Sequence, residues 1–96
     1  MGNIEFAWDR RKARSNLAKH GVSFEEAQTV FLDENARLIN DPDHSGEEER
    51  FVLLGYSFQA RCLIVSHFYR ESSSLIRLIS ARRATTHEEE LYWRLR

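Results

Sequence analysis

The sequence predicts a small α+β protein in which helices pack on a twisted antiparallel sheet. Capping signals and helical periodicity mark residues 9–35 and the segment after residue 85, whereas alternating apolar runs and short polar turns fill residues 37–82. Strands joined by short turns pair antiparallel. We therefore expect a four-stranded meander plus an N-terminal strand, packed by two N-terminal helices and one C-terminal helix. A chain of 96 residues, 42% of them hydrophobic, indicates one domain over residues 1–96.

The first third of the chain predicts one strand and two helices. Residues 4–8 alternate apolar positions and are rich in aromatic side chains, which favours a strand. Asp9 can cap a helix that runs to about His20, where a glycine follows as the C-terminal stop. Ser23 begins a capping box that opens a second helix, which we expect to end within residues 33–35.

The remainder predicts four strands and a last helix. The strands are expected at residues 37–40, 50–56, 61–69 and 75–82, and Thr85 begins a second capping box that opens the final helix. The intervening turns fall at residues 41–48, 57–60 and 71–74.

The formal net charge of −1 conceals an uneven distribution. Residues 1–23 carry five Lys or Arg and two acids, and residues 61–87 carry five Lys or Arg and one acid. Residues 24–60 instead carry two Lys or Arg and nine acids. The net charges of these segments are therefore +3, +4 and −7. Two basic segments that meet in space would form a basic face suited to nucleic acid.

Several classes of protein and site are excluded. A lone Cys62 cannot form an internal disulfide framework, and the four histidines show no metal-ligand spacing, so we expect no cofactor and no metal. The sequence holds neither a signal-peptide pattern nor an apolar run near the roughly 18 residues that span a bilayer. We expect a cytoplasmic protein without a membrane partner.

The first predicted helix carries a polar stripe at the edge of its buried face. At 100° per residue, Lys12, Asn16, Lys19 and His20 fall in one arc, with Leu17 just beyond it towards the core. These side chains suit a binding surface. Cations in the last helical turn also stabilise the helix dipole, which is a sufficient structural reason for the Lys-His pair.

Arginines occur within or at the ends of the last two predicted strands. Arg77 interrupts an aliphatic run, where a buried strand prefers apolar residues. One interpretation is a cross-strand ion pair with Glu71 or Glu49. The other is a phosphate clamp formed by Arg70, Arg77 and Arg82, because the planar guanidinium fits phosphate oxygens.

The strand pattern conflicts with a single shared site. Strict alternation places His67 and Glu71 on one face of their strand and Arg70 on the other. It also separates Arg77 from Arg82. Convergence of these side chains requires a β-bulge.

Several segments, in order along nearly the whole chain, resemble the signatures of BrnT-type toxins. Residues 6–9 (Phe-Ala-Trp-Asp) and 19–27 (Lys-His-Gly-Val-Ser-Phe-Glu-Glu-Ala) match the amino-terminal signature. Residues 67–71 (His-Phe-Tyr-Arg-Glu) and 76–85 (Ile-Arg-Leu-Ile-Ser-Ala-Arg-Arg-Ala-Thr) match the carboxy-terminal one. The resemblance implies a RelE-like fold and a metal-independent ribonuclease that arrests translation. It further implies neutralisation by a DNA-binding, BrnA-like antitoxin, in a heterotetramer that meets operator DNA only through the antitoxin.

A metal-independent RNA cut uses the neighbouring 2′-OH as nucleophile, together with a base, an acid and cations. His67 is the first candidate for acid or base, and His20 or Lys19 is the second. Glu71 is an alternative base or orients an arginine, and the arginine clamp stabilises the phosphorane. The remaining expected RNA contacts are Lys12, Asn16 and Ser80.

Two other functions stay open. Residues 86–90 read Thr-His-Glu-Glu-Glu, and this acidic start of the last helix favours a catalytically weak module that holds the antitoxin in a repressor complex. A nucleic-acid-binding domain without toxicity would instead bind RNA tightly, in a salt-dependent manner and without turnover.

Overall fold

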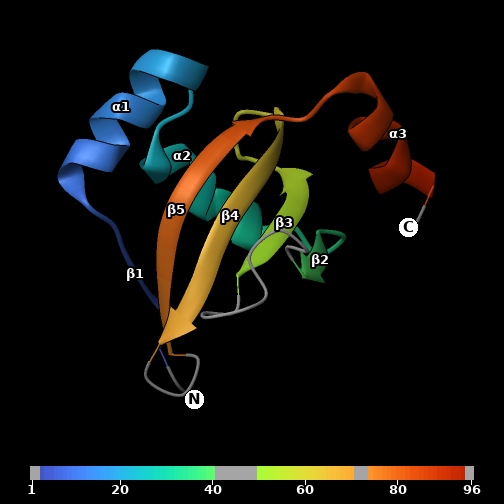
Figure 1. Ribbon diagram of the computed structural model, residues 1–96. Coiled ribbons are helices and arrows are strands. Elements are labelled where there is room, and N and C mark those ends of the chain that lie inside the picture. Colours follow the sequence, from blue (N-terminus) through green and yellow to red (C-terminus); the bar gives the residue numbers. More distant parts are fainter. Residues whose placement is uncertain (1–2, 41–49, 71–73, 95–96) are drawn as a thin grey trace.

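The computed structural model describes residues 3–40, 50–70 and 74–94. It is an α+β structure with a mixed five-stranded sheet in the order β1-β5-β4-β3-β2, as Figure 1 shows. The elements are β1 (Glu5–Ala7), α1 (Arg10–His20), α2 (Phe24–Gln28), the 3₁₀ helix η1 (Thr29–Leu32), β2 (Arg37–Asn40), β3 (Phe51–Tyr56), β4 (Cys62–Arg70), β5 (Leu75–Arg83) and α3 (Thr86–Arg94). The predicted α+β class is confirmed. The turn expected at residues 41–48 lies outside the described residues, as does nearly all of the turn at 71–74.

The strand directions agree with the prediction for the meander and differ for β1. β2, β3, β4 and β5 pair antiparallel in succession, as their short connections require. β1 instead runs parallel to β5, with Phe6 beside Ile76. The expectation of a wholly antiparallel sheet is therefore wrong for this strand. A turn sets the relative direction of the strands that it joins, and β1 is joined to α1 rather than to its partner strand.

The helix boundaries follow local hydrogen bonds. The Asp9 carboxylate accepts from the backbone N–H groups of Arg11 and Lys12, and Gly21 closes α1 with a φ of 70°. The second helix ends earlier than predicted, because the chain tightens from α2 into η1 at Thr29. The Thr29 hydroxyl donates to the carbonyl of Glu26 at 2.7 Å, a local bond that competes with a regular helix.

Two apolar clusters cover the two faces of the sheet. α2 and η1 lie behind the sheet in Figure 1 and bury Phe24, Ala27 and Val30 against it. On the other face, Tyr92 of α3 packs on a smaller cluster. Leu17 was expected to face the core, but it is 50% exposed because α1 lies beside the edge of β5. No helix in the described part of the chain is long and apolar enough to cross a membrane.

Candidate active site

A bulge in β5 decides which side chains share a face of the sheet. His67 pairs with Leu78 while the preceding Ser66 pairs with Ser80, so Ile79 is the extra residue on β5. The register on either side of this bulge is regular. The alternation of β5 therefore changes phase at Ile79, which a strict two-residue repeat cannot anticipate.

The change of phase brings the predicted arginine clamp onto one face. Arg77, Ser80 and Arg82 pair with Phe68, Ser66 and Ile64, which alternate regularly on one side of β4. Arg70 lies on this same side, with its guanidinium carbon 4.7 Å from the ring centre of Phe68. We call the set Arg70, Arg77, Ser80 and Arg82 the arginine face. Strict alternation along the sequence would place Arg77 and Arg82 on opposite faces of the sheet, and the bulge places them on the same face.

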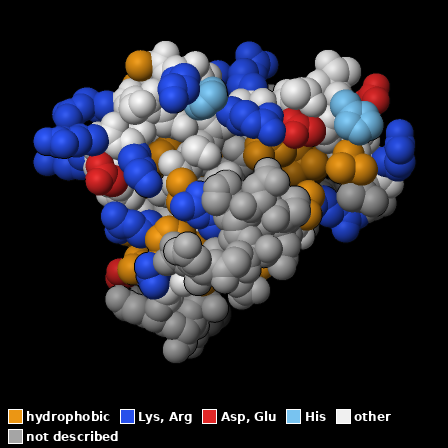
Figure 2. Space-filling view, in the orientation of Figure 1, with side chains coloured by type: hydrophobic (Ala, Val, Ile, Leu, Met, Phe, Trp, Pro, Cys, Tyr) orange, Lys and Arg blue, Asp and Glu red, His pale blue; other side chains and the backbone are white. Residues whose placement is uncertain are grey.

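A hollow of about 240 Å³ lies between α1 and β5, next to the arginine face. We call it the α1–β5 hollow. Figure 2 shows blue Lys and Arg side chains gathered around this region of the surface. It is lined by Lys12, Ser15, Asn16, Lys19, His20, Ile79 and Ser80, which include all five residues predicted to contact RNA. The two basic segments of the sequence therefore meet here.

Asn16 lines this hollow, but its side chain is hydrogen-bonded to backbone groups of the protein and has a structural role. Its carboxamide accepts from the Ala81 N–H at 3.0 Å and donates to the Ala81 carbonyl at 2.8 Å and to the Val22 carbonyl at 2.9 Å. The side chain thereby pairs with the free edge of β5 beyond the end of β1, as a further strand would. Lys12, Lys19 and His20 are exposed at the same hollow and present the groups available to a ligand.

His67 lies on the opposite face of the sheet and is fully buried. Its Nδ1 lies 3.1 Å from the carbonyl oxygen of Val65, which can only accept, so this nitrogen carries the proton. Its Nε2, 3.3 Å from the Tyr69 hydroxyl, is then the acceptor. Burial lowers the pKa of His67 below its ordinary value, because the charged ring would lose its hydration. His67 is therefore neutral at pH 7 and separated from the arginine face by the sheet.

The first turn of α3 reaches the arginine face at Arg82. Both terminal nitrogens of Arg82 donate to the Glu88 carboxylate at 2.9 Å, and the Thr85 N–H donates to it at 2.8 Å. These hydrogen bonds, led by those from Arg82, lower the pKa of Glu88 to about 2. Glu88 thus neutralises part of the predicted clamp, as the acidic start of this helix suggested.

Some predicted contacts cannot be placed. Glu71 lies outside the described residues, and so does Glu49, the other acid considered as an ion-pair partner for Arg77. Within residues 3–40, 50–70 and 74–94, no three His, Cys, Asp or Glu side chains gather as a metal site would require. Sequence reasoning missed Ser15 and Ile79 at the hollow. Ser15 lies next to the polar stripe on the helical wheel, whereas Ile79 is aliphatic and gives no sequence signal.

Comparison with known proteins identifies the family of the chain. The family model described as the ribonuclease toxin BrnT of type II toxin–antitoxin systems matches residues 8–88. The chain belongs to the BrnT family. Its structure is also similar to the crystal structure of the Brucella abortus ribonuclease toxin BrnT, with a TM-score of 0.66 and 22% identity over 88% of this chain and 100% of that one. No curated protein matches the chain. Membership of this family of toxins implies an RNA substrate and an antitoxin partner for the chain.

Proposed function

We propose that this BrnT-family protein acts in the cytoplasm as a metal-independent endoribonuclease that arrests translation. The observation that carries the proposal is the meeting of Lys12, Lys19 and His20 with Ser80 at the α1–β5 hollow, beside the arginine face. Lys12 and Lys19 line the hollow from α1, and Arg77 lies on the face of β5 that carries Ser80, more than fifty residues further along the chain. A concave surface with cations in it and beside it is what a phosphodiester substrate requires.

The chemistry follows from the groups gathered there. The 2′-oxygen of the RNA attacks the adjacent phosphorus, a base takes the 2′-OH proton, and the bond to the 5′-oxygen breaks as an acid protonates that oxygen. The products are a 2′,3′-cyclic phosphate and a 5′-hydroxyl. Arg77, Lys12 and Lys19 stabilise the charge that builds on the phosphorane oxygens, and the Ser80 hydroxyl donates to one of them.

Two histidines are candidates for the residue that transfers a proton. His67 was the first candidate in the sequence, but in this structure its ring is buried behind the sheet and both ring nitrogens have partners. His20 is exposed at the end of α1 and lines the hollow itself. A general base must lie within hydrogen-bond reach of its proton, so the geometry favours His20. His67, with the Tyr69 hydroxyl bonded to it, then acts as a positioning residue for β4.

Cleavage of a synthetic RNA by the purified protein in EDTA tests this assignment. We expect His20→Ala to lower the single-turnover rate by about 10²–10⁴-fold, the range for loss of a proton-transfer group. Arg77→Ala should lower it by about 10²–10³-fold, the range for loss of a group that stabilises developing charge. Arg11→Ala, which removes an exposed cation of α1 outside the hollow, is the matched control and should leave the rate unchanged. A substrate with 2′-O-methyl groups should resist cleavage. Loss of activity in EDTA, or full activity of His20→Ala, would overturn the mechanism.

We further propose that a BrnA-like antitoxin with a DNA-binding domain neutralises the protein. Two toxin and two antitoxin chains would form a heterotetramer that meets operator DNA only through the antitoxin. Membership of a toxin family of type II systems supports an antitoxin partner, and the stoichiometry is tested by the mass of the co-expressed complex in light scattering. A mass that corresponds to any other ratio contradicts the heterotetramer.

One observation favours a second function, that of a catalytically weak module within the repressor complex. The Glu88 carboxylate occupies both terminal nitrogens of Arg82, the same nitrogens that would hold a phosphate. In that case the wild type would cut RNA slowly, and Glu88→Gln would raise the rate. A wild type that cuts rapidly, at a rate that Glu88→Gln does not increase, excludes this function.

A further inference from the structure

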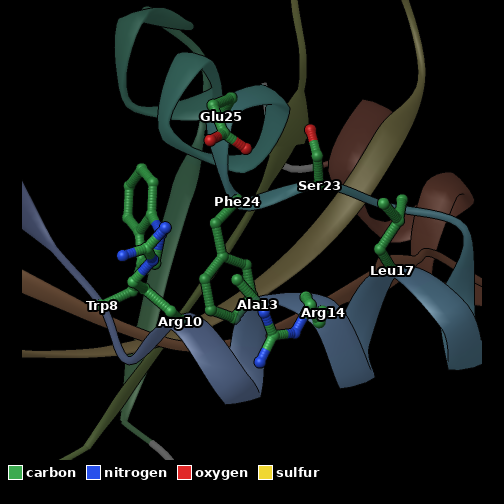
Figure 3. A pocket seen from close by; sticks show the side chains of 8 residues that line it. All are labelled: Trp8, Arg10, Ala13, Arg14, Leu17, Ser23, Phe24 and Glu25. Atoms are coloured by element: carbon green, nitrogen blue, oxygen red, sulfur yellow. The ribbon is translucent and has the colours of Figure 1, made fainter.

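A second depression lies on the other side of α1 from the α1–β5 hollow. It encloses about 350 Å³ between α1 and α2, at the lower end of the range of about 300–1,000 Å³ for ligand pockets. We call it the α1–α2 groove. Figure 3 shows Phe24 between the two helices, with Arg10 and Arg14 on the α1 side and Glu25 on the α2 side. None of these residues has a part in the proposed cleavage.

Half of the residues that line the groove are apolar, and as a group these are incompletely covered. Trp8 packs edge-to-face on Phe24 with ring centres 5.8 Å apart, and Ala13 is half-buried beside them. Leu17 completes this lining and is 50% exposed, although it extends the apolar stripe of its helix. Covering an apolar side chain stabilises a complex by roughly 25 cal/mol for each Å² removed from water. The groove therefore presents an apolar surface that a partner side chain can cover.

The rim of the groove carries charges with no partners in the described part of the chain. Arg10, Arg14 and Glu25 make no ion pair with any residue that the structure describes. Two cations against one anion favour a ligand that is acidic overall. The Glu25 carboxylate would repel RNA phosphates, and the exposed aliphatic side chain of Leu17 offers a phosphate no hydrogen bond. A peptide with an apolar anchor between acidic side chains matches both features.

We propose that the α1–α2 groove binds an acidic segment of the antitoxin, which inserts an apolar side chain between Leu17 and Trp8. The inference rests on the proposed function in that the partner is an antitoxin. Because the groove and the hollow lie along different sides of α1, binding to the antitoxin and cleavage of RNA are separable by mutation. Acidic side chains of the segment pair with Arg10 and Arg14, which makes the affinity dependent on salt.

The affinity for the tagged antitoxin and the RNA cleavage rate without antitoxin, measured on the same preparations, test this inference. We expect Leu17→Glu to weaken antitoxin binding at least tenfold, and Arg14→Glu to weaken it and to flatten its salt dependence. Both variants should retain RNA cleavage within twofold of the wild type. Arg11→Glu is the matched control, since Arg11 is exposed on α1 but does not line the groove, and it should change neither quantity.

Each possible outcome bears on the inference. Circular dichroism and thermal unfolding first establish that the variants are folded, which half-exposed Leu17 and exposed Arg14 permit. Unchanged antitoxin affinity in both folded variants overturns the inference. So does a loss of RNA cleavage with unchanged antitoxin affinity, which would assign the groove to RNA. If the wild-type protein binds the antitoxin but does not cut RNA, the proposed ribonuclease function is contradicted. The inference about the groove is unaffected by that result, because it is tested by the affinity for the antitoxin.

Discussion

Replacing Asn16 by alanine should destabilise the protein more than an alanine at any other position of α1, because Asn16 is the buried residue of that helix. The substitution leaves three backbone groups without partners, namely the N–H and C=O of Ala81 and the C=O of Val22, and both residues are fully buried. A buried polar group that loses its partner costs about 1–3 kcal/mol. Because Asn16 borders the hollow, water can partly replace the amide, so the lower figure applies to each group. The expected loss is about 3 kcal/mol of the free energy of unfolding.

Urea unfolding followed by circular dichroism measures this loss. With an m-value of about 1 kcal/mol/M, the midpoint should fall by about 3 M. Ser15→Ala is the control, because Ser15 is an exposed neighbour on the same helix and alanine favours helix. Asn16→Asp should also destabilise at pH 7, since a carboxylate there would face two carbonyl oxygens. A loss below about 1 kcal/mol for Asn16→Ala would refute the view that this amide holds α1 to the edge of β5.

Three further predictions concern titration and packing. The pKa of His67 lies below its ordinary 6.5, so the unfolded chain binds this proton more readily and stability should fall as the pH drops below 6.5. His67→Gln should lose that part of the pH dependence, which urea midpoints at pH 5 and 7.5 detect. The pKa of Glu88 is lowered from 4.5 to about 2, so its contribution is complete above 4.5 and disappears as the pH falls towards 2. Acid titration of Glu88→Gln should lack this transition, and a curve that overlays the wild type would contradict the pairing with Arg82. Gly55→Ala should cost about 1–3 kcal/mol, since a Cβ there would lie 2.9 Å from that of Ala36. A thermal midpoint equal to that of the wild type would contradict this, because it would show that Ala36 and the other neighbours move aside without cost.

Much of the fold could be predicted because its signals are local. Asp9 and Ser23 cap the helices that they were expected to begin. The second capping box forms completely, since Thr85 and Glu88 exchange side chain-to-backbone bonds. Four meander strands follow from short turns between apolar runs. The direction of β1 could not be predicted in this way, because its partner lies seventy residues further along the chain.

The candidate site depended on contacts that a linear pattern does not contain. Helical spacing grouped Lys12, Lys19 and His20 correctly, but it could not show that Asn16 turns inward to reach Ala81. The bulge at Ile79 comes from one additional residue in a strand of ordinary composition, and it decides the face of every side chain beyond it. The rings of Phe31, Phe51 and Tyr69 pack around His67, and Phe31 comes from a helix distant in sequence. Such contacts are determined by packing rather than by periodicity.

The contact between α1 and β5 also determines when the hollow can form during synthesis of the chain. The hydrogen bonds between Asn16 and Ala81 join positions 65 residues apart. At a synthesis rate of about 5–20 residues per second, the ribosome needs about 3–13 s to make that length. Until then a nascent chain has the lysines of the hollow but not the strand that completes it. Because residues of both α1 and β5 line the hollow, the surface that we propose for RNA forms only after β5 has been made, well after α1.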